Sequence, residues 1–371
     1  MIHGFLKACT VSPALRVADC AFNTQQTIAA MQRAAADGVQ LAVFPELGLT
    51  GYTCGDLFFQ QPLQRAAARG LTAVLEASAD LDLVALVGLP VTVDGKLYNC
   101  AAVVCHGKLL GLVPKTYLPN YGEFYERRQF NPAPAGVRTL HFAGQEVLFG
   151  TKLLFRCAEM PEFCLGVEVC EDLWAPLPPS THHALAGATV IANLSASDET
   201  IGKADYRRAL VSQQSARLLC AYLYADAGHG ESTTDMVFAA HDLICENGTL
   251  LSEAKPFGAG YACTELDLGR MVSERCRSTT FRLENTGYAT VEFHLRSGRC
   301  RSRGMSRRRR SSRRMMPHVP SAASSFLPCR RTVWPSASPM RTQRPPSSAS
   351  PAGWTAASPC SWPCARCSSS P

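Results

Sequence analysis

Apolar residues in the first part of the chain recur in two patterns, one with helical spacing and one in short continuous runs. Ile28, Met31 and Ala35 lie three or four positions apart, which places them on one face of a helix. Spacing of this kind predicts three long helices, at residues 23–36 with Asn23 as the N-cap, at 57–77 and at 206–219.

The short apolar runs predict β-strands. They lie at residues 5–10, 41–44, 83–89, 91–93, 97–104, 108–114, 163–169 and 188–194. Asp94-Gly95 and His106-Gly107 predict tight turns between consecutive strands, and residues 236–252 are expected to form a hairpin that turns at Asn247-Gly248. Because strands alternate with helices and hairpins, the predicted fold class is α/β.

Polar residues directly follow three of these strands. They are Glu46, Cys170 and the segment Asn193–Ser197. The ends of strands are where α/β scaffolds present their chemistry. We therefore expect these positions to contribute to a functional site.

Charge divides the chain near residue 295. The 371 residues include 37 Lys and Arg and 30 Asp and Glu, for a formal net charge of +7. Residues 296–371 hold 15 Arg and no Lys, Asp or Glu, which leaves 22 basic and 30 acidic side chains, a net charge of −8, in residues 1–295. We predict a globular domain at 1–295 and an Arg-, Ser- and Pro-rich tail at 296–371, whose composition is typical of disorder.

Cysteine usage and the N-terminal sequence indicate the compartment. Twelve of the 17 cysteines precede residue 280, mostly in apolar strand-like stretches, which favours buried free thiols in a reducing compartment over disulfides. Residues 1–10 lack the features of a signal peptide, and no apolar run approaches the length of about 18 residues that a membrane span needs. A cytoplasmic protein without membrane contact is expected.

Glu46, Lys115 and Cys170 each follow an apolar run. Burial raises the pKa of a carboxyl group towards the range of a general base, and a thiol near a cation and a base can act as a nucleophile. Taken singly, each residue has a more common interpretation: a surface carboxylate, a solvated lysine and a core thiol. The ordered set is much more specific than any one member.

The segments around these residues resemble a known family. FPELGLTGY, LVPKTYLPNYGEFYE and GVEVCEDLW are similar to the three signature segments of the carbon–nitrogen hydrolase (nitrilase) superfamily. Within it, CEDLW, NLSAS at 193–197, KADYR at 203–207 and GESTTD at 230–235 resemble the glutaminase domains of glutamine-dependent NAD synthetases. The resemblance covers residues 6–294.

The resemblance implies a four-layer α-β-β-α sandwich that hydrolyses an amide. Glu46 would be the general base, Lys115 the oxyanion stabiliser and Cys170 the nucleophile that attacks the carboxamide carbon of glutamine. Ammonia would leave, and water would hydrolyse the resulting thioester to glutamate.

The resemblance also implies the substrate contacts and the cofactors. Tyr121, Ser197 and Lys203 would hold glutamine, although the family more often has Arg at the position of Lys203. Glu123 is a further candidate from the loop of Tyr121, with a purely structural role as its alternative. No cofactor or metal is implied for the glutaminase domain. ATP with Mg and deamido-NAD serve the synthetase domain, and full-length members form homo-oligomers.

The tail suggests a shifted reading frame. The synthetase domain of the family carries the phosphate loop Ser-Gly-Gly-Leu-Asp-Ser, which is absent here as written. Read from the third base of each codon, Trp354 (TGG) and Thr355 (ACN) give GAC for Asp, and the codons of residues 350–356 permit the rest of the motif. We hypothesise that the frame shifts near Leu295, so that the synthetase domain is missing and the Arg runs do not indicate nucleic-acid binding.

Two other functions stay open at this point. One is a free-standing amidase or nitrilase of the same superfamily. The other is a nucleic-acid-binding protein that acts through the basic tail, because clustered Arg residues neutralise phosphates.

Sequencing the gene across codons 290–300 tests the frame hypothesis. We expect one base in this region to be inserted or deleted relative to the frame that encodes the synthetase motif downstream. An intact frame across these codons contradicts the hypothesis.

Overall fold

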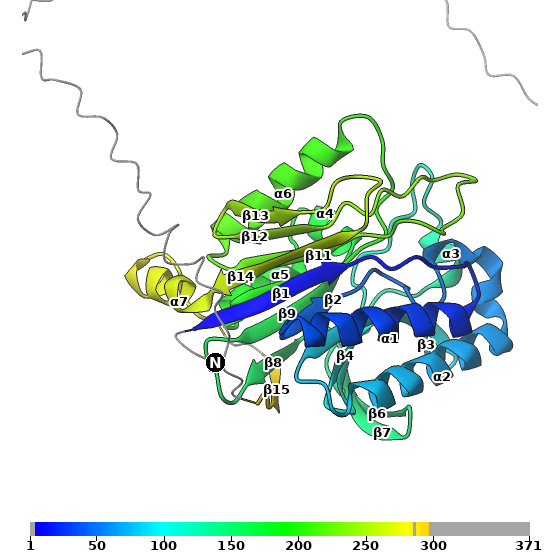
Figure 1. Cartoon of the computed structure of the whole chain (residues 1–371), viewed down its shortest axis with the longest axis horizontal. Coiled ribbons are helices and arrows are strands. Elements are labelled where there is room, and N and C mark those ends of the chain that lie inside the picture. Colours follow the sequence, from blue (N-terminus) through cyan, green and yellow to red (C-terminus); the bar gives the residue numbers. More distant parts are fainter. Residues whose placement is uncertain (1–3, 285–286, 297–371) are drawn as a thin grey trace, which may run out of the picture. The chain divides into compact units, whose positions relative to one another are not determined.

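Two mixed β-sheets packed face to face form the centre of the fold (Figure 1). The computed structural model describes residues 4–284 and 287–296. In the first sheet the strands lie in the order β14 (Tyr261–Asp267), β1 (Phe5–Val11), β2 (Leu41–Val43), β3 (Val84–Val93), β4 (Lys96–Cys105), β5 (Lys108–Pro114), β7 (Gln145–Phe149) and β6 (Arg138–Phe142). In the second the order is β13 (Thr249–Glu253), β12 (Leu243–Glu246), β11 (Ala221–Ala225), β10 (Val190–Leu194), β9 (Cys164–Val169), β8 (Leu153–Cys157) and β15 (Ala289–Phe293).

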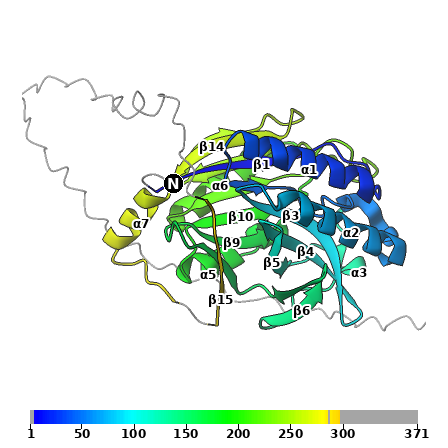
Figure 2. The same cartoon turned by 60° about the horizontal axis from the view of Figure 1, so that its bottom comes forward.

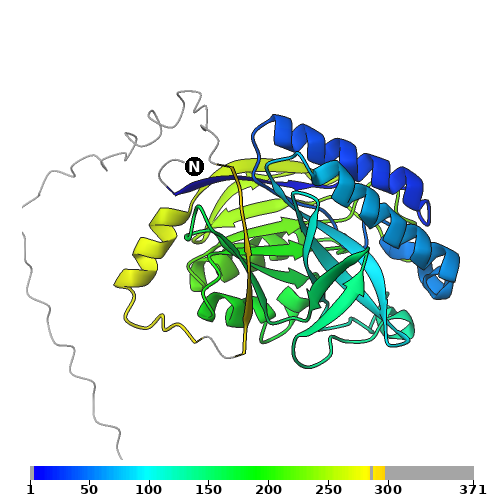
Figure 3. The same cartoon turned by 90° about the horizontal axis from the view of Figure 1, so that it is seen from below.

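Helices cover the outer face of each sheet (Figures 2 and 3). The first sheet carries α1 (Cys20–Ala36) and α2 (Gln61–Ser78), and the second carries α5 (Pro179–Leu185) and α6 (Lys203–Arg217). Met31 of α1 shares one outer core with strands of the first sheet, and Val211 of α6 shares the other with strands of the second. The predicted four-layer α-β-β-α sandwich is therefore confirmed. Shorter or peripheral elements are the 3-10 helix η1 (Tyr52–Phe59), α3 (Glu126–Gln129), α4 (Glu171–Trp174) and α7 (Leu268–Arg277).

Strand β3 shows why the central strands are apolar throughout. Val84 and Leu86 belong to the core between the sheets, whereas Ala85 and Val87 belong to the core beneath α1 and α2. Successive side chains of a strand point to opposite faces, so a strand covered on both faces is continuously apolar. Such a run predicts a buried strand but does not indicate which sheet it joins.

The strands predicted at 83–89 and 91–93 are a single strand. Pro90 separates the two predicted strands, since proline has no N–H to donate to a neighbouring strand. In the structure, β2 pairs only with residues 84–86 of β3, so no bond to β2 is lost at Pro90. Pairing with β4 continues through Pro90, which lies opposite Asn99.

The predicted turns are correct, but one hairpin is shorter than expected. Residues of both turns, Asp94-Gly95 and His106-Gly107, have positive φ angles between 47° and 74°, as tight two-residue turns require. Strands β12 and β13 flank the predicted turn at Asn247-Gly248. Residues 236–242 form no strand, only an isolated bridge between Phe238 and Asp198.

The predicted start of the first helix was wrong. Helix α1 begins at Cys20, and its N-cap is Asp19, whose carboxylate accepts a hydrogen bond from the N–H of Phe22 at 3.0 Å. Asn23 lies within the helix, where its side chain bonds the N–H and the carbonyl of Arg16. Both are good capping residues, so local sequence did not separate them.

The helix predicted at 57–77 is two elements. Helix η1 ends at Phe59, Gln60 is extended with φ −79° and ψ 119°, and α2 then begins at Gln61. Pro62 lies in the first turn of α2, where a missing N–H costs nothing. Several elements were not predicted because they are short or only half-buried: β6, β7, β8, β14, β15 and α7.

The twelve cysteines before residue 280 are all free and ten of them are buried, as predicted. Within the described ranges, no helix is long and apolar enough to cross a membrane. Leu295 is still part of the fold, since it is buried and its N–H donates to Glu159 at 3.0 Å. Beyond Arg296, the predicted tail and the frame hypothesis concern residues outside the described ranges.

Two glycines allow close approach within the sheets and give a stability prediction. A Cβ on Gly88 would lie 2.3 Å from the backbone nitrogen of Leu47, whereas a Cβ on Gly111 would lie 2.7 Å from ring atoms of Phe155. Gly111→Ala is expected to lower the free energy of unfolding by about 1–3 kcal/mol, as overpacking does. Gly88→Ala is expected to cost more, because backbone cannot rotate aside as a ring can.

Urea unfolding of both variants and wild type measures the difference. A cost for Gly88→Ala equal to or below that for Gly111→Ala would contradict this account of the close approach.

Candidate active site

Glu46 and Lys115 lie side by side at the carboxyl ends of their strands. Glu46 follows β2, and Lys115 follows β5 directly. Lys115 Nζ is 2.6 Å from Glu46 Oε1, and both side chains are fully excluded from solvent. The N–H of Glu46 donates to the carbonyl of Ser195 at 3.2 Å, so this segment also bonds the end of β10 in the second sheet.

Two further donors fix the Glu46 carboxylate. Asn99 Nδ2 donates to Oε1 at 2.5 Å, and the N–H of Ala196 donates to Oε2 at 3.0 Å. Asn99 comes from the first sheet and Ala196 from the loop after β10 in the second. The carboxylate is therefore held from both sheets in one orientation beside Lys115.

A second buried carboxylate, Glu126, faces the same ammonium group. Lys115 Nζ lies 2.6 Å from Glu126 Oε1, to which the hydroxyl of Tyr52 also donates at 2.7 Å. Burial raises the pKa of Glu126 to about 7, although Lys115 opposes the shift. Its Oε2 atom has no hydrogen-bond partner among the described residues.

Sequence reasoning missed Glu126 and named Glu123 instead. Both belong to the segment LVPKTYLPNYGEFYE, and nothing in their spacing distinguishes them. In the structure, Glu123 is half-buried and lines a cavity of about 300 Å³ together with Tyr52 and Glu126. Of these two glutamates, Glu126 is the one that forms an ion pair with Lys115.

Lys115 stays charged because of its two carboxylate neighbours. Burial by itself lowers the pKa of a lysine, but Glu126 and Glu46 outweigh burial and hold the pKa of Lys115 well above its usual value. A permanent positive charge therefore lies inside the molecule.

Cys170 is buried at the end of β9, in an unusual backbone conformation. Its φ is 46° and its ψ is −99°, a region that residues other than glycine rarely adopt. Burial first, and the charge of Glu46 second, raise the pKa of its thiol well above the usual value, against the opposing effect of Lys115. The thiol is therefore protonated at neutral pH.

Asn193 holds the backbone of Cys170 on both sides. Asn193 Oδ1 accepts from the Cys170 N–H at 2.9 Å, and its Nδ2 donates to the Cys170 carbonyl at 3.4 Å and to the Tyr222 hydroxyl at 3.1 Å. Tyr222 in turn donates to the buried carboxylate of Glu168. This chain of buried hydrogen bonds stabilises the strained backbone conformation of Cys170.

Asp172 joins the Lys115 segment to the Cys170 segment. Its carboxylate accepts from the N–H groups of Thr116 at 3.0 Å, Tyr117 at 2.8 Å and Val169 at 3.0 Å. Burial raises the pKa of Asp172 well above its usual value, while these N–H groups oppose the shift. One buried side chain thus sets the spacing between two predicted catalytic residues.

Tyr121 and Lys203, two of the predicted substrate residues, both lie against Phe124. The ring of Tyr121 packs edge-on against Phe124 with centroids 6.1 Å apart, and its hydroxyl donates to Glu171 at 2.8 Å. Lys203 Nζ lies 5.6 Å from the centre of the Phe124 ring and 5.5 Å from that of Trp174. Tyr121 is 60% exposed whereas Phe124 is buried, so the rim formed by these aromatic and cationic groups opens to solvent at Tyr121.

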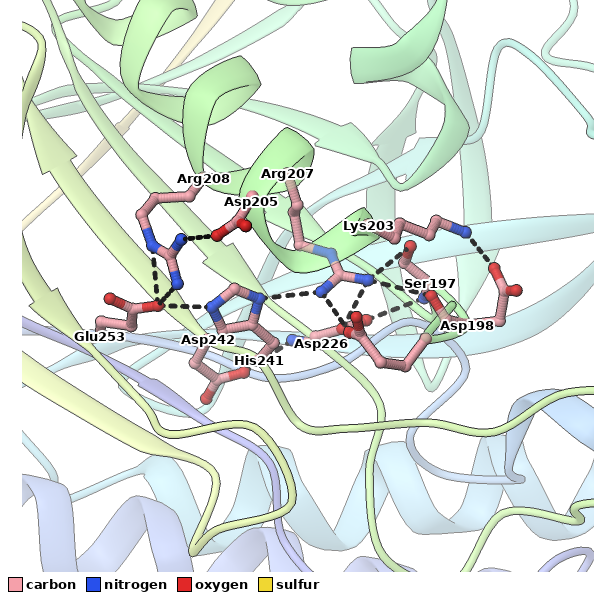
Figure 4. A network of polar contacts seen from close by, with 11 residues as sticks. Ser197, Asp198, Lys203, Asp205, Arg207, Arg208, Asp226, His241, Asp242 and Glu253 are labelled. Atoms are coloured by element: carbon pink, nitrogen blue, oxygen red, sulfur yellow. Dashed lines mark hydrogen bonds and ion pairs between the residues drawn. The ribbon is translucent and has the colours of Figure 1, made fainter. Parts of the chain in front are cut away.

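Ser197, the third predicted substrate residue, is buried next to this rim. Its N–H donates to Asp226 at 2.8 Å, and its hydroxyl accepts from Arg207 at 3.2 Å (Figure 4). The next residue, Asp198, forms an ion pair with Lys203. Ser197 therefore connects to Lys203 on one side and, through the adjacent Ala196 N–H, to Glu46 on the other.

Glu231 was not identified from the sequence as a structural support of Tyr52. Its carboxylate accepts from the N–H groups of Tyr52 at 2.6 Å and Thr53 at 3.0 Å. It belongs to the segment GESTTD, which was noted only as part of the family resemblance. No sequence signal indicates which carboxylates of such a loop point inwards.

Comparisons with known proteins identify the family of the chain. Residues 8–275 match the carbon–nitrogen hydrolase family model. The chain is 44% identical over 281 residues to the glutamine-dependent NAD(+) synthetase of Mycobacterium tuberculosis. The aligned region covers 75% of this chain and 41% of that protein.

Two solved structures extend the comparison. The glutamine-dependent NAD(+) synthetase from Cytophaga hutchinsonii superposes with a TM-score of 0.63 at 27% identity, over 70% of this chain and 42% of that one. An amidase from Nesterenkonia superposes with a TM-score of 0.56 at 19% identity, over 75% of this chain and 97% of that one. The chain thus spans less than half the length of the synthetases it matches. Because the family match extends over residues 8–275, the chain belongs to the carbon–nitrogen hydrolase family.

Proposed function

We propose that the chain hydrolyses the side-chain amide of glutamine, through a thioester on Cys170. The observation that carries the proposal is the buried contact of 2.6 Å between Lys115 and Glu46, whose charges both act on the Cys170 thiol. The Mycobacterium tuberculosis relative, 44% identical, is a glutamine-dependent NAD(+) synthetase, which supports glutamine as the amide.

In the first half of the reaction, Glu46 accepts the proton of the Cys170 thiol. The thiolate sulfur forms a bond to the carboxamide carbon, and the electron pair of the carbonyl moves to its oxygen. Lys115, together with a backbone N–H just after Cys170, stabilises this oxyanion, and preorganised donors of this kind are typically worth about 3–4 kcal/mol. Glu46 then passes its proton to the nitrogen, the C–N bond breaks and ammonia leaves.

In the second half, Glu46 takes a proton from water as the water oxygen attacks the thioester carbon. A second oxyanion forms beside Lys115, and the C–S bond breaks to release glutamate. The sulfur recovers a proton from Glu46, which restores the resting state. The raised pKa of the Cys170 thiol favours this return, because the neutral thiol is the resting form.

Glu126 acts through Lys115 in this scheme. Its carboxylate lies 2.6 Å from the ammonium and, together with Glu46, fixes its position. Lys115 therefore points in one direction before substrate arrives, so little reorganisation is needed as the oxyanion forms. Glu126 is a positioning residue by this account and does not exchange protons with the substrate.

Substrate recognition is proposed for Tyr121, Ser197 and Lys203. The rim formed by Tyr121, Phe124, Trp174 and Lys203 offers aromatic faces and a cation to an amino acid bound with its amide towards Cys170. Glu123 stays a candidate from the same loop.

Use of the ammonia for NAD formation is a proposal taken from the relatives. The chain matches 41% of the length of the Mycobacterium tuberculosis synthetase, so ATP, Mg, deamido-NAD and a homo-oligomer would concern the whole enzyme. A cytoplasmic location and the absence of nucleic-acid binding likewise stay predictions.

The second candidate is a free-standing amidase. The structure of the Nesterenkonia amidase, which matches over 97% of its length, shows that this fold can constitute a whole protein. Comparing kcat/KM for glutamine with that for butyramide, which lacks the α-ammonium and α-carboxylate groups, separates the two. A preference for butyramide would favour the amidase.

Loss of the nucleophile or the base is expected to stop glutamate release. Cys170→Ala should abolish it, and Glu46→Gln should lower kcat by about 10²–10⁴-fold, as loss of a general base does. An enzyme-coupled glutamate assay measures both, with the exposed Cys276→Ala as the matched control that keeps the wild-type rate. Wild-type activity in Cys170→Ala would remove this thiol from the mechanism.

Removal of the Asn193 side chain is expected to lower kcat with little change in KM. Asn193→Ala frees the backbone of Cys170 to leave its strained conformation, and a misplacement of about 1 Å in an active site can cost about 10²-fold in rate. Steady-state kinetics with glutamine give the two constants. Tyr222→Phe, which removes only the hydroxyl behind Asn193, should have a smaller effect, and a larger effect than that of Asn193→Ala would contradict the proposed order of support.

A further inference from the structure

Arg207 is the largest side chain that the fold buries completely. It lies on α6. The next residue, Arg208, is partly exposed and forms ion pairs with Asp205 and Glu253. Figure 4 shows the Arg207 guanidinium pointing inward from the helix, towards Ser197 and Asp226. Because burial of a charge is costly unless it is paired and hydrogen-bonded, its partners indicate what it does.

The guanidinium contacts three consecutive residues of the loop between β10 and α6. Nη2 donates to the hydroxyl of Ser197 at 3.2 Å and to the carbonyl of Asp198 at 3.0 Å, and Nη1 donates to Glu199 at 2.9 Å. The rigid fork of an arginine side chain suits such convergent acceptors. It therefore fixes a backbone segment as well as two side chains.

Asp226 also bonds the same loop. Its Oδ1 accepts from the N–H of Ser197 at 2.8 Å, and its Oδ2 lies 3.8 Å from Arg207 Nη2. Burial raises the pKa of Asp226 to about 6, against the opposing charge of Arg207. Ser197 is thus hydrogen-bonded through its N–H to Asp226 and through its hydroxyl to Arg207.

His241 completes the orientation of Arg207. The contact between Arg207 Nη1 and His241 Nδ1 measures 2.9 Å, and because arginine only donates, Nδ1 must be the unprotonated nitrogen. Nε2 then carries the hydrogen and donates to Glu253 at 2.7 Å. Burial lowers the pKa of His241, which keeps the ring in this neutral form.

The loop held in this way carries the proposed glutamine contacts. It contains Ser197, and Asp198 pairs with Lys203 at the start of α6. Within the described part of the chain, Arg207 forms no hydrogen bond or ion pair with Glu46, Lys115 or Cys170. Its effect should therefore fall on binding and not on the thiol chemistry.

We propose that Arg207, oriented by His241 and Asp226, is a positioning residue that holds the 197–203 loop in the conformation that binds glutamine. Loss of this support weakens recognition of the α-carbon end of the substrate and leaves the reactivity of Cys170 intact. The inference rests on the proposed function, because it assigns a purpose to the loop of that same site.

The test compares two reagents that alkylate Cys170. 6-Diazo-5-oxo-L-norleucine has the shape of glutamine and needs the substrate loop, whereas iodoacetamide is small and does not. Mass spectrometry of the peptide that contains Cys170 follows both reactions, and the concentration that gives half-maximal rate measures binding of the glutamine-shaped reagent.

His241→Leu removes the acceptor for Arg207 and is expected to raise the half-saturating concentration of the glutamine-shaped reagent at least about tenfold, the scale of one lost hydrogen bond to a charged group. The rate with iodoacetamide should stay within about twofold. His241→Asn, whose Oδ1 can replace Nδ1 as acceptor, should recover most of the affinity. Arg217→Met, on the same helix but outside the network, is the matched control.

Arg207→Met should show the same pattern with a larger shift. If this variant fails to fold, the two His241 variants still decide the question. Equal slowing of both reagents in His241→Leu, or no difference between the Leu and Asn variants, would show a merely structural role and overturn the inference. If wild type reacts with the glutamine-shaped reagent without saturation, the proposed function itself fails.

Discussion

The burial of one ammonium group is the constraint on which the rest of the site depends. Lys115 has no access to solvent, and the penalty for such burial is several kcal/mol per ion unless partners replace the lost water. Glu46 and Glu126, each 2.6 Å away, supply that replacement. Asn99, Tyr52 and the Ala196 N–H in turn donate hydrogen bonds to these two carboxyl groups.

The same charge balance explains why Cys170 rests as a thiol. Burial and the carboxylates raise the pKa of Cys170 more than Lys115 lowers it. Preparation of the site therefore lies in geometry and not in a preformed thiolate. Asn193 and Asp172 provide that geometry, one by holding the backbone of Cys170 and the other by joining its segment to that of Lys115.

The sequence predicted the residues that follow strands and missed those that act through them. Glu46, Lys115 and Cys170 each follow an apolar run, and the ends of strands meet at one edge of a sheet. Glu126 and Asp172 lie in short helices of four residues, where no periodic pattern indicates which side chain points inwards. The prediction of the N-cap of α1 was wrong for a related reason. Asp19 and Asn23 are equally good capping residues by type, but the side chain of Asn23 bonds the backbone of Arg16 instead. Long-range contacts decide each of these cases, and a local pattern does not contain them.

The site is divided between the two sheets. Glu46, Asn99 and Lys115 come from the first, whereas Cys170, Asn193 and Ala196 come from the second. The apolar layer between the sheets, about 10 Å deep in such packings, therefore acts as a spacer whose thickness fixes how far Glu46 lies from Cys170. A methylene group added to or removed from that layer alters the separation of these two side chains. The volume of the interior thus sets the geometry of the site as well as the stability of the fold.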